Sequence, residues 1–234
     1  MVQDSQPANE SYHPQDVVFI NTHLIQRAME GLQKSREKFQ ALLEQAELGE
    51  LSVQYDLALR YLEGDGVEAD PVQAAAWLER AAAQDFPRAV SILGNCYEGG
   101  TGVERDPERA VQLYRRAAQQ DYAPAMCNLG YCYLTGIGTE PSPEQAVHWL
   151  RRAAEQDFPR ALDLLGDCAA DGVGMEADPA KAVEYYRRGA ELNYPPAMVS
   201  LGLCYENGRG VAADPARALE LYCRAGERGE PAGA

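Results

Sequence analysis

Residues 89–118 read AVSILGNCYEGGTGVERDPERAVQLYRRAA, and this stretch contains one complete helical hairpin. Its first apolar residues recur at the spacing of one helix face: Ala89, Leu93, Cys96 and Tyr97. Three glycines follow within four residues, and glycine reaches positive φ without a Cβ clash. The pattern therefore predicts a first helix of about three turns that ends in a tight turn.

The second half of the same stretch predicts a second helix. Asp106 can cap its exposed N–H groups, and Pro107 fits the first helical position because proline lacks only a donor that had no partner there. The residues on its apolar face are Ala110, Leu113, Tyr114 and Ala117. Two short helices cannot bury these faces alone, so hairpins of this kind must stack into a continuous core.

The hairpin is repeated along the chain at a period of 36 residues with no insertion. The register superposes the glycines inside the first helix, which are Gly94, Gly130, Gly166 and Gly202. It also superposes the prolines that open the second helix, which are Pro71, Pro107, Pro143, Pro179 and Pro215. The expected units are 53–88, 89–124, 125–160, 161–196 and 197–232. The fold class predicted is an all-α solenoid of stacked helix-turn-helix repeats.

Two further positions of the repeat carry structural expectations. A glycine inside a helix costs about 1 kcal/mol relative to alanine, so we expect close helix approach at Gly94 and its equivalents, with a Tyr97-type ring over the bare backbone. The exit of each second helix is expected to adopt a left-handed conformation. The residues at that exit are Gly49, Asp85, Asp121, Asp157, Asn193 and Gly229.

These residues resemble the Sel1-like repeat family, a relative of the tetratricopeptide solenoids. The resemblance is carried by a series that starts at Ala89 and ends at Ala118: Ala89, Leu93, Gly94, Tyr97, Gly100, Gly102, Val103, Asp106, Ala110, Tyr114, Ala117 and Ala118. It implies a right-handed superhelix whose first helices line the concave face, and an adaptor that assembles other proteins. The chain departs from the pattern at Ala58, which replaces the glycine, and at Ala169, which replaces the tyrosine.

The two ends of the array are expected to differ. Residues 1–16 form a polar tail expected to be disordered, and 17–52 carry a helical stripe that predicts a capping helix or partial repeat. Mixed charges on that stripe argue against the alternative of an amphipathic membrane helix. No capping helix follows the fifth unit, so either the chain is truncated there or a second copy covers the end as a homodimer.

Charge narrows the choice of partner. The formal net charge of −15 argues against nucleic acid and against an anionic membrane surface, because both would repel the chain. No early apolar run is long enough for a signal sequence, which predicts a cytoplasmic protein, although a removed signal sequence would leave the same pattern.

Chemistry-bearing residues are few, and we expect no enzyme, cofactor or metal. Four of the six cysteines share one repeat position and are expected to be buried, unbridged fillers: Cys96, Cys132, Cys168 and Cys204. The histidines do not come together in the sequence. The stretch 35–38 matches the S-x-x-K signature of penicillin-recognising hydrolases, but it lies on a charged helix and no accompanying motif is present.

The first-helix residues that vary between units are the candidate partner-binding residues, since the resemblance points them toward the concave groove. They are Tyr55, Leu59, Leu62, Asn95, Glu98, Cys127, Tyr131, Leu134, Asp163, Asp167, Val199, Leu203 and Glu206. They predict apolar patches at units one and three and an acidic patch at unit four, suited to a peptide with basic and apolar anchors. The alternatives are that these residues pack against neighbouring helices, or that the protein is a self-assembling structural array.

Overall fold

The computed structural model describes residues 14–229, and this part of the chain contains eleven α-helices and no strand. Residues 1–13, most of the expected tail, lie outside the described residues. The first helix α1 spans Pro14–Glu47, so it begins inside the segment expected to be a tail. A three-residue turn separates it from the repeats.

The repeats alternate two kinds of helix of nearly equal length. The first helices of the five units are α2 (Leu51–Glu63), α4 (Pro87–Gly99), α6 (Ala123–Thr135), α8 (Pro159–Asp171) and α10 (Pro195–Asn207). The second helices are α3 (Pro71–Ala83), α5 (Pro107–Ala118), α7 (Pro143–Glu155), α9 (Pro179–Glu191) and α11 (Pro215–Gly229). Each helix packs against the one before and the one after it, which confirms the predicted solenoid of stacked hairpins.

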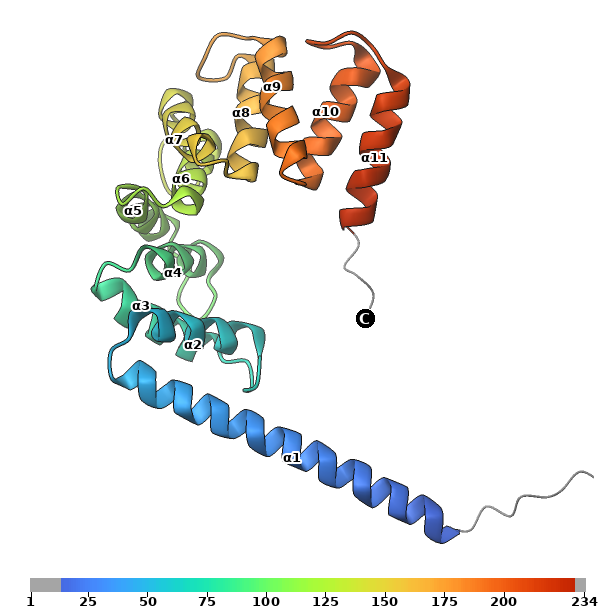
Figure 1. The fold of residues 1–234 in the computed structure, drawn as a ribbon. Helices are drawn as coiled ribbons and strands as arrows, with labels where there is room; N and C mark the ends of the chain where they lie inside the picture. The colour runs from blue at the N-terminus through green and yellow to red at the C-terminus, as the bar shows by residue number, and fades with distance from the viewer. Residues whose placement is uncertain (1–13, 230–234) are drawn as a thin grey trace, which may run out of the picture.

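The stack is curved, and the first helices lie on its inner side (Figure 1). Direct packing between first helices of successive units is strongest for α6 with α8 and for α8 with α10. The second helices form the outer layer. The core between the two layers consists mainly of Ala, Leu, Tyr and Cys side chains contributed by every unit.

The predicted helix start at Asp106 and Pro107 is confirmed, and so are five of the six predicted left-handed exits; Gly229, the sixth, is the last residue of α11. The Asp106 carboxylate accepts a hydrogen bond from the Arg109 backbone N–H at 3.0 Å, and Pro107 occupies the first position of α5. The exits before the next unit have positive φ at Gly49, Asp85, Asp121, Asp157 and Asn193. Short Asp and Asn side chains tolerate this region better than other non-glycine residues, so the sequence marks each exit.

The glycine inside each first helix permits close helix approach as expected, but the side chain that covers it is a different one. A Cβ at Gly94 would lie 2.6 Å from the Tyr114 ring, and one at Gly130 would lie 2.7 Å from Leu150 Cγ. The covering residue therefore comes from the second helix of the same unit, and the Tyr97-type ring was the wrong prediction. Hairpin packing within the unit brings Tyr114 to Gly94, whereas Tyr97 lies three residues along the same helix.

The turn glycines also set the contact between units. Gly138 has φ 68°, and a Cβ on it would overlap the backbone of Pro107 and Glu108 at the start of the preceding second helix. No side chain fits there, so the turn of one unit rests directly on the backbone of the unit before it.

Helix α1 behaves differently along its length. Its C-terminal part packs on the first unit through Phe39, Leu42 and Leu43, and Gln54 donates a hydrogen bond to the Ala46 carbonyl at 3.0 Å. Its middle part projects away from the stack (Figure 1), and Met29 is 64% exposed there. No helix in residues 14–229 has the length and apolar character needed to cross a membrane.

The cysteine predictions are confirmed. Cys96, Cys132, Cys168 and Cys204 are buried and unbridged, and so is Cys127. Burial raises the pKa of the Cys132 thiol to about 12. These thiols act as small core side chains and are poor nucleophiles at neutral pH.

Candidate functional site on the inner face

The inner face is the surface of α2, α4, α6, α8 and α10 that looks into the curve, and all thirteen predicted partner-binding residues belong to these helices. The structure leaves most of their side chains exposed or half-buried. The face divides into a middle region on units two to four and an acidic region on units four and five.

The middle region is built around a tyrosine hydroxyl that comes from beneath it. Tyr114 of α5 donates to Glu98 at 2.6 Å and lies 2.8 Å from the Asn95 carbonyl oxygen. Burial and the neighbouring Glu98 carboxylate raise the pKa of Tyr114, so its proton stays in place. Tyr114, which covers Gly94, thus also orients the inner-face side chains of Asn95 and Glu98.

Three successive first helices are linked across this region by polar contacts. Arg160 of α8 donates to Asn128 of α6 at 2.8 Å, and Asn128 donates to Asn95 of α4 at 3.1 Å. The Arg160 guanidinium also lies 5.0 Å from the centre of the Tyr131 ring. These contacts surround a surface cavity of about 380 Å³. It is lined by Asn95, Glu98, Gly99, Asn128, Tyr131 and Arg160.

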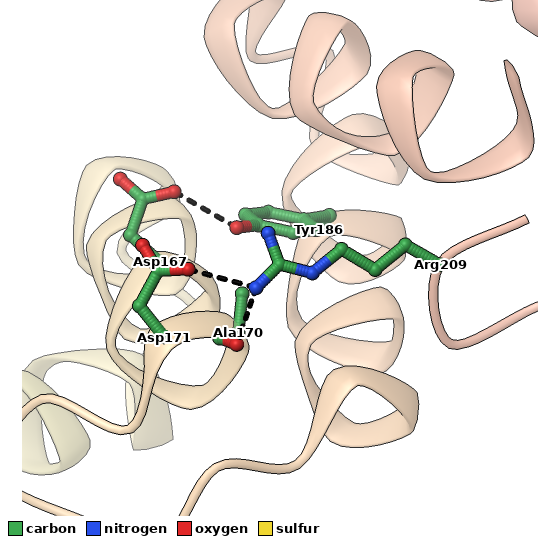
Figure 2. A network of polar contacts seen from close by, with 5 residues as sticks. All are labelled: Asp167, Ala170, Asp171, Tyr186 and Arg209. Atoms are coloured by element: carbon green, nitrogen blue, oxygen red, sulfur yellow. Dashed lines mark hydrogen bonds and ion pairs between the residues drawn. The ribbon is translucent and has the colours of Figure 1, made fainter. Parts of the chain in front are cut away.

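The acidic region carries two carboxylates one turn apart on α8. Asp163 accepts a hydrogen bond from Ser200 at 3.1 Å, and Asp167 accepts one from Tyr186 at 2.8 Å (Figure 2). Burial, with the nearby Asp167 charge, raises the pKa of Asp163 to about 6. Burial also raises the pKa of Asp167. Neither carboxylate has an ion-pair partner among the described residues.

A cationic side chain lies beside these carboxylates but is already engaged. Arg209, from the turn after α10, donates to Asp171 at 2.8 Å and to the Ala170 carbonyl at 2.6 Å (Figure 2). The cavity between α8 and α10 has a volume of about 290 Å³, and Asp167, Tyr186, Ser200, Leu203 and Arg209 are among its lining residues. This cavity can hold a side chain that offers apolar contact and a positive charge.

The apolar side chains of the predicted surface are distributed unevenly. Val199 and Leu203 of α10 are 41% and 49% exposed, whereas Tyr55 is half-buried against Phe86 with ring centres 5.9 Å apart. The other apolar predicted residues, Leu59, Leu62 and Leu134, are half-buried. Glu206 is exposed and accepts from Tyr222 at 2.8 Å. The largest exposed apolar side chains thus lie beside the acidic region.

Cys127 requires a correction. Its side chain is fully buried, and burial raises its pKa to about 12. Repeat position alone placed it on the groove, but in unit three the side chain is part of the hydrophobic core cluster. Cys127 is therefore part of the core and does not belong to the surface described here.

Arg160 and Asn128 belong to the inner face, although the sequence analysis did not select them. The equivalent of Arg160 is also an arginine in unit two (Arg88) but serine or proline in the other units, and the equivalents of Asn128 all differ from it, so repeat alignment gives neither position a common role. The available signal is that Arg160 is one of few basic residues on a first helix. Its significance depends on the distance between α6 and α8, which the sequence does not contain.

Metal-ligating side chains do not gather among the described residues. Residues 14–229 contain no group of three His, Cys, Asp or Glu side chains placed to hold a metal ion. Ser35 and Lys38 lie within the charged helix α1, where Gln33 donates to Glu37 at 3.0 Å. The inner face therefore offers binding groups, namely amides, a guanidinium, carboxylates and apolar side chains.

Comparison with known proteins identifies the repeat. The model of the Sel1 repeat matches residues 51–86, 87–122, 123–158, 159–194 and 195–230. The matched units begin two residues before those expected from the sequence, and each begins at the first residue of a first helix. No curated protein sequence matches the chain.

Two solved structures are similar over most of the chain. A Sel1 repeat protein from Oxalobacter formigenes is 35% identical, with a TM-score of 0.75, over 86% of this chain and 81% of that one. The protective antigen c5321 of uropathogenic Escherichia coli is 29% identical, with a TM-score of 0.73. The match to c5321 covers 89% of this chain and 49% of the antigen, so this chain spans about half its length.

Proposed function

Because the chain belongs to the Sel1 repeat family, whose members are generally protein-interaction scaffolds, we propose that its inner face captures a segment of another protein. The segment is an extended or helical peptide with a basic anchor and apolar anchors. The observation that carries the proposal is the Asp163 and Asp167 pair, whose charges have no cationic partner among the described side chains.

The physical argument is one of desolvation and complementarity. Two half-desolvated carboxylates that lack a counter-charge destabilise the free protein, and a Lys or Arg of the partner would relieve that cost. Val199 and Leu203 lie on the neighbouring helix and offer apolar contact next to this anchor site. Arg160 and the amides of Asn95 and Asn128 can bond to the polar backbone of an extended segment.

The test uses the double variant Tyr131→Ala with Asp163→Lys in the full chain. We expect it to lose the partners that the native chain captures from a host lysate, identified by mass spectrometry, while its melting temperature does not fall. Retention should also decrease with added salt, because an exposed charge pair is screened. Glu184→Lys on the outer layer makes the same charge change away from the inner face and should retain the partners.

The alternative assignment gives a different outcome. If Tyr131 and Asp163 serve only to pack the first helices, the double variant will melt at a lower temperature. Partner loss would then follow from unfolding. Partner retention by a stable double variant would contradict binding at the inner face.

Self-association is a second candidate function, and exposed apolar side chains at both ends of the array favour it. Leu219 of α11 is 64% exposed, and Leu24 and Ile25 of α1 are both 59% exposed. A second copy of the chain that covers either end would bury this surface. Light scattering over a range of concentrations tests it, since a constant monomer mass would rule out this function.

We further propose that the protein works in a reducing compartment such as the cytoplasm. The support for this is that all six cysteines are free. Five of them are buried, and Cys223 is exposed. Alkylation of the protein isolated from the native host and unfolded without reductant would test it, because reduced cysteines would then all be labelled and oxidised ones would not.

A further inference from the structure

On the outer layer, the seams between the second helices of successive units contain a tyrosine from the first helix beneath them at units two, three and five. Tyr133 accepts a hydrogen bond from Arg115 at 2.9 Å, and Tyr205 accepts one from Arg217 at 3.2 Å. Tyr97 donates to Glu79 at 3.0 Å, and the Arg109 guanidinium lies 4.2 Å from the centre of its ring. The seams of units two, three and five thus each hold a phenol ring with a polar partner for its oxygen.

Unit four breaks this pattern because Ala169 occupies the tyrosine position. The residues that would bind the phenol are nevertheless present. Arg151 is equivalent to Arg115, and Lys181 is equivalent to Arg217. Neither side chain has a hydrogen-bond or ion-pair partner among residues 14–229.

The seam between α7 and α9 also contains a cavity near these two side chains. It contains a cavity of about 330 Å³ lined by Arg151, Ala154, Glu155, Leu165, Lys181, Tyr185 and Arg188. The cavity one unit later is about 230 Å³, and its lining contains the seven equivalent residues together with Tyr205 and Glu220. The two cavities are the same feature of the repeat, and the one that lacks the tyrosine is larger.

The charges around the open cavity favour an electron-rich occupant. Arg188 is engaged by Asp157 at 2.6 Å and by the Ala154 carbonyl at 2.9 Å. Arg151 and Lys181 remain, against the single carboxylate of Glu155. In the filled seam of unit five, hydrogen bonds from Arg217 and Arg187 lower the pKa of the Tyr205 hydroxyl. The same kind of environment at unit four stabilises an oxygen that carries negative charge.

We propose that the seam between α7 and α9 is a binding pocket for a tyrosine side chain of another protein. The ring lies beside Tyr185, and its oxygen is bonded by Arg151 and Lys181, as the chain's own tyrosines are bonded in the other seams. This site is on the opposite layer from the inner face, so it does not depend on the function proposed there.

The experiment titrates the full chain with 4-methylphenol, with 4-methylphenyl phosphate and with toluene, and follows backbone amide resonances by NMR. We expect the phenol to shift resonances of α7 and α9 around Arg151 and Lys181, and toluene to shift them much less. Tighter binding of the phosphate would identify phosphotyrosine as the natural form, and tighter binding of the phenol would identify unmodified tyrosine.

The decisive variant is Ala169→Tyr, which restores the chain's own ring to the seam. It should abolish the shifts caused by the phenol, because the chain's own hydroxyl then competes for Arg151 and Lys181. If this variant fails to fold, the double variant Arg151→Gln with Lys181→Gln, at two exposed positions, should weaken binding at least tenfold.

Two controls complete the design. Arg187→Gln changes the equivalent arginine in the seam that Tyr205 already fills, and Tyr131→Ala changes the inner face, so both should bind the phenol as the native chain does. The proposal is overturned if neither oxygen-bearing probe shifts the seam, if toluene shifts it equally, or if folded Ala169→Tyr still responds.

Discussion

Two adjacent positions of the first helices differ in how much their residue varies between units. The first is the glycine at 94, 130, 166 and 202, which is buried in units two to five and covered by a side chain of the second helix. The next residue along the chain is Asn95, Tyr131, Asp167 or Leu203, and it faces the inner side of the curve. A rotation of 100° about the helix axis separates a position where packing allows one residue from a position where residues vary freely.

The difference shows where stability and recognition are located. At the glycine position a methyl group would overlap a ring or a leucine, so substitution affects the whole hairpin. At the neighbouring position the side chain contacts solvent and a few polar groups, so substitution changes what the surface can bind. Three predictions test this separation, from the largest effect to the smallest.

The largest effect is expected from Gly130→Leu. Leu150 Cγ lies 2.7 Å from where the new Cβ would be, so the leucine must separate α6 from α7. We expect a loss of about 3 kcal/mol in the free energy of unfolding, measured by urea denaturation. Gly226→Leu is the matched control, because a Cβ at Gly226 meets no atom within 4 Å. Equal stability of the two variants would show that the glycine position is not restricted by packing.

An intermediate effect with the opposite sign is expected from Asp163→Asn on the inner face. The pKa of Asp163 is about 6 in the folded protein and 3.8 in a model carboxyl, so the folded state binds the proton more tightly. Stability is therefore present below pH 4 and is lost as the pH rises toward 6. At pH 7 the asparagine variant should be more stable by roughly 1–3 kcal/mol.

The pH dependence of stability distinguishes the raised pKa of Asp163 from a general effect of removing one negative charge. Asp163→Asn should flatten the stability profile between pH 4 and 6, whereas Glu184→Gln on the outer layer removes the same charge and should leave that profile unchanged. A profile that Asp163→Asn does not alter would place the unfavourable charge elsewhere.

The smallest effect is expected at a repeated position that lies on the surface. Arg152 pairs with Asp121 of the previous unit, as Arg116 pairs with Asp85 and Arg188 with Asp157. Exposed ion pairs contribute little, so Arg152→Met should cost at most about 1 kcal/mol by the same denaturation assay. A loss as large as that of Gly130→Leu would show that these pairs, together with the core, hold successive units in place.

Much of the fold could be predicted from the sequence, because the residues that start and end each helix recur in every unit. Proline after Asp106 and its equivalents predicts a helix start, and Asp121 or Asn193 predicts a left-handed exit. These requirements are local, since they depend on the φ and hydrogen bonding of one residue and its neighbours. The inner-face assignment was also largely available, because helix periodicity and variation between units select the same residues.

Errors arose wherever the answer depended on the distance between helices. The sequence alone assigned the cover of Gly94 to Tyr97, placed Cys127 on the surface and gave no role to Arg160. All three depend on how closely first helices approach one another and on which turn of the second helix meets them. Helix periodicity gives the direction of a side chain about its own axis but not the neighbour that it meets.

The sequence by itself determined the family, the 36-residue hairpin and the order of the helices, because these depend on local backbone preference and on a strictly repeated apolar pattern. Only the tertiary structure decided that Asp163 and Asp167 share a partly desolvated surface and that a cavity remains beside Arg151 and Lys181 in the seam of unit four. The reason is that desolvation and cavities are properties of the space between elements, which forms only when successive units pack.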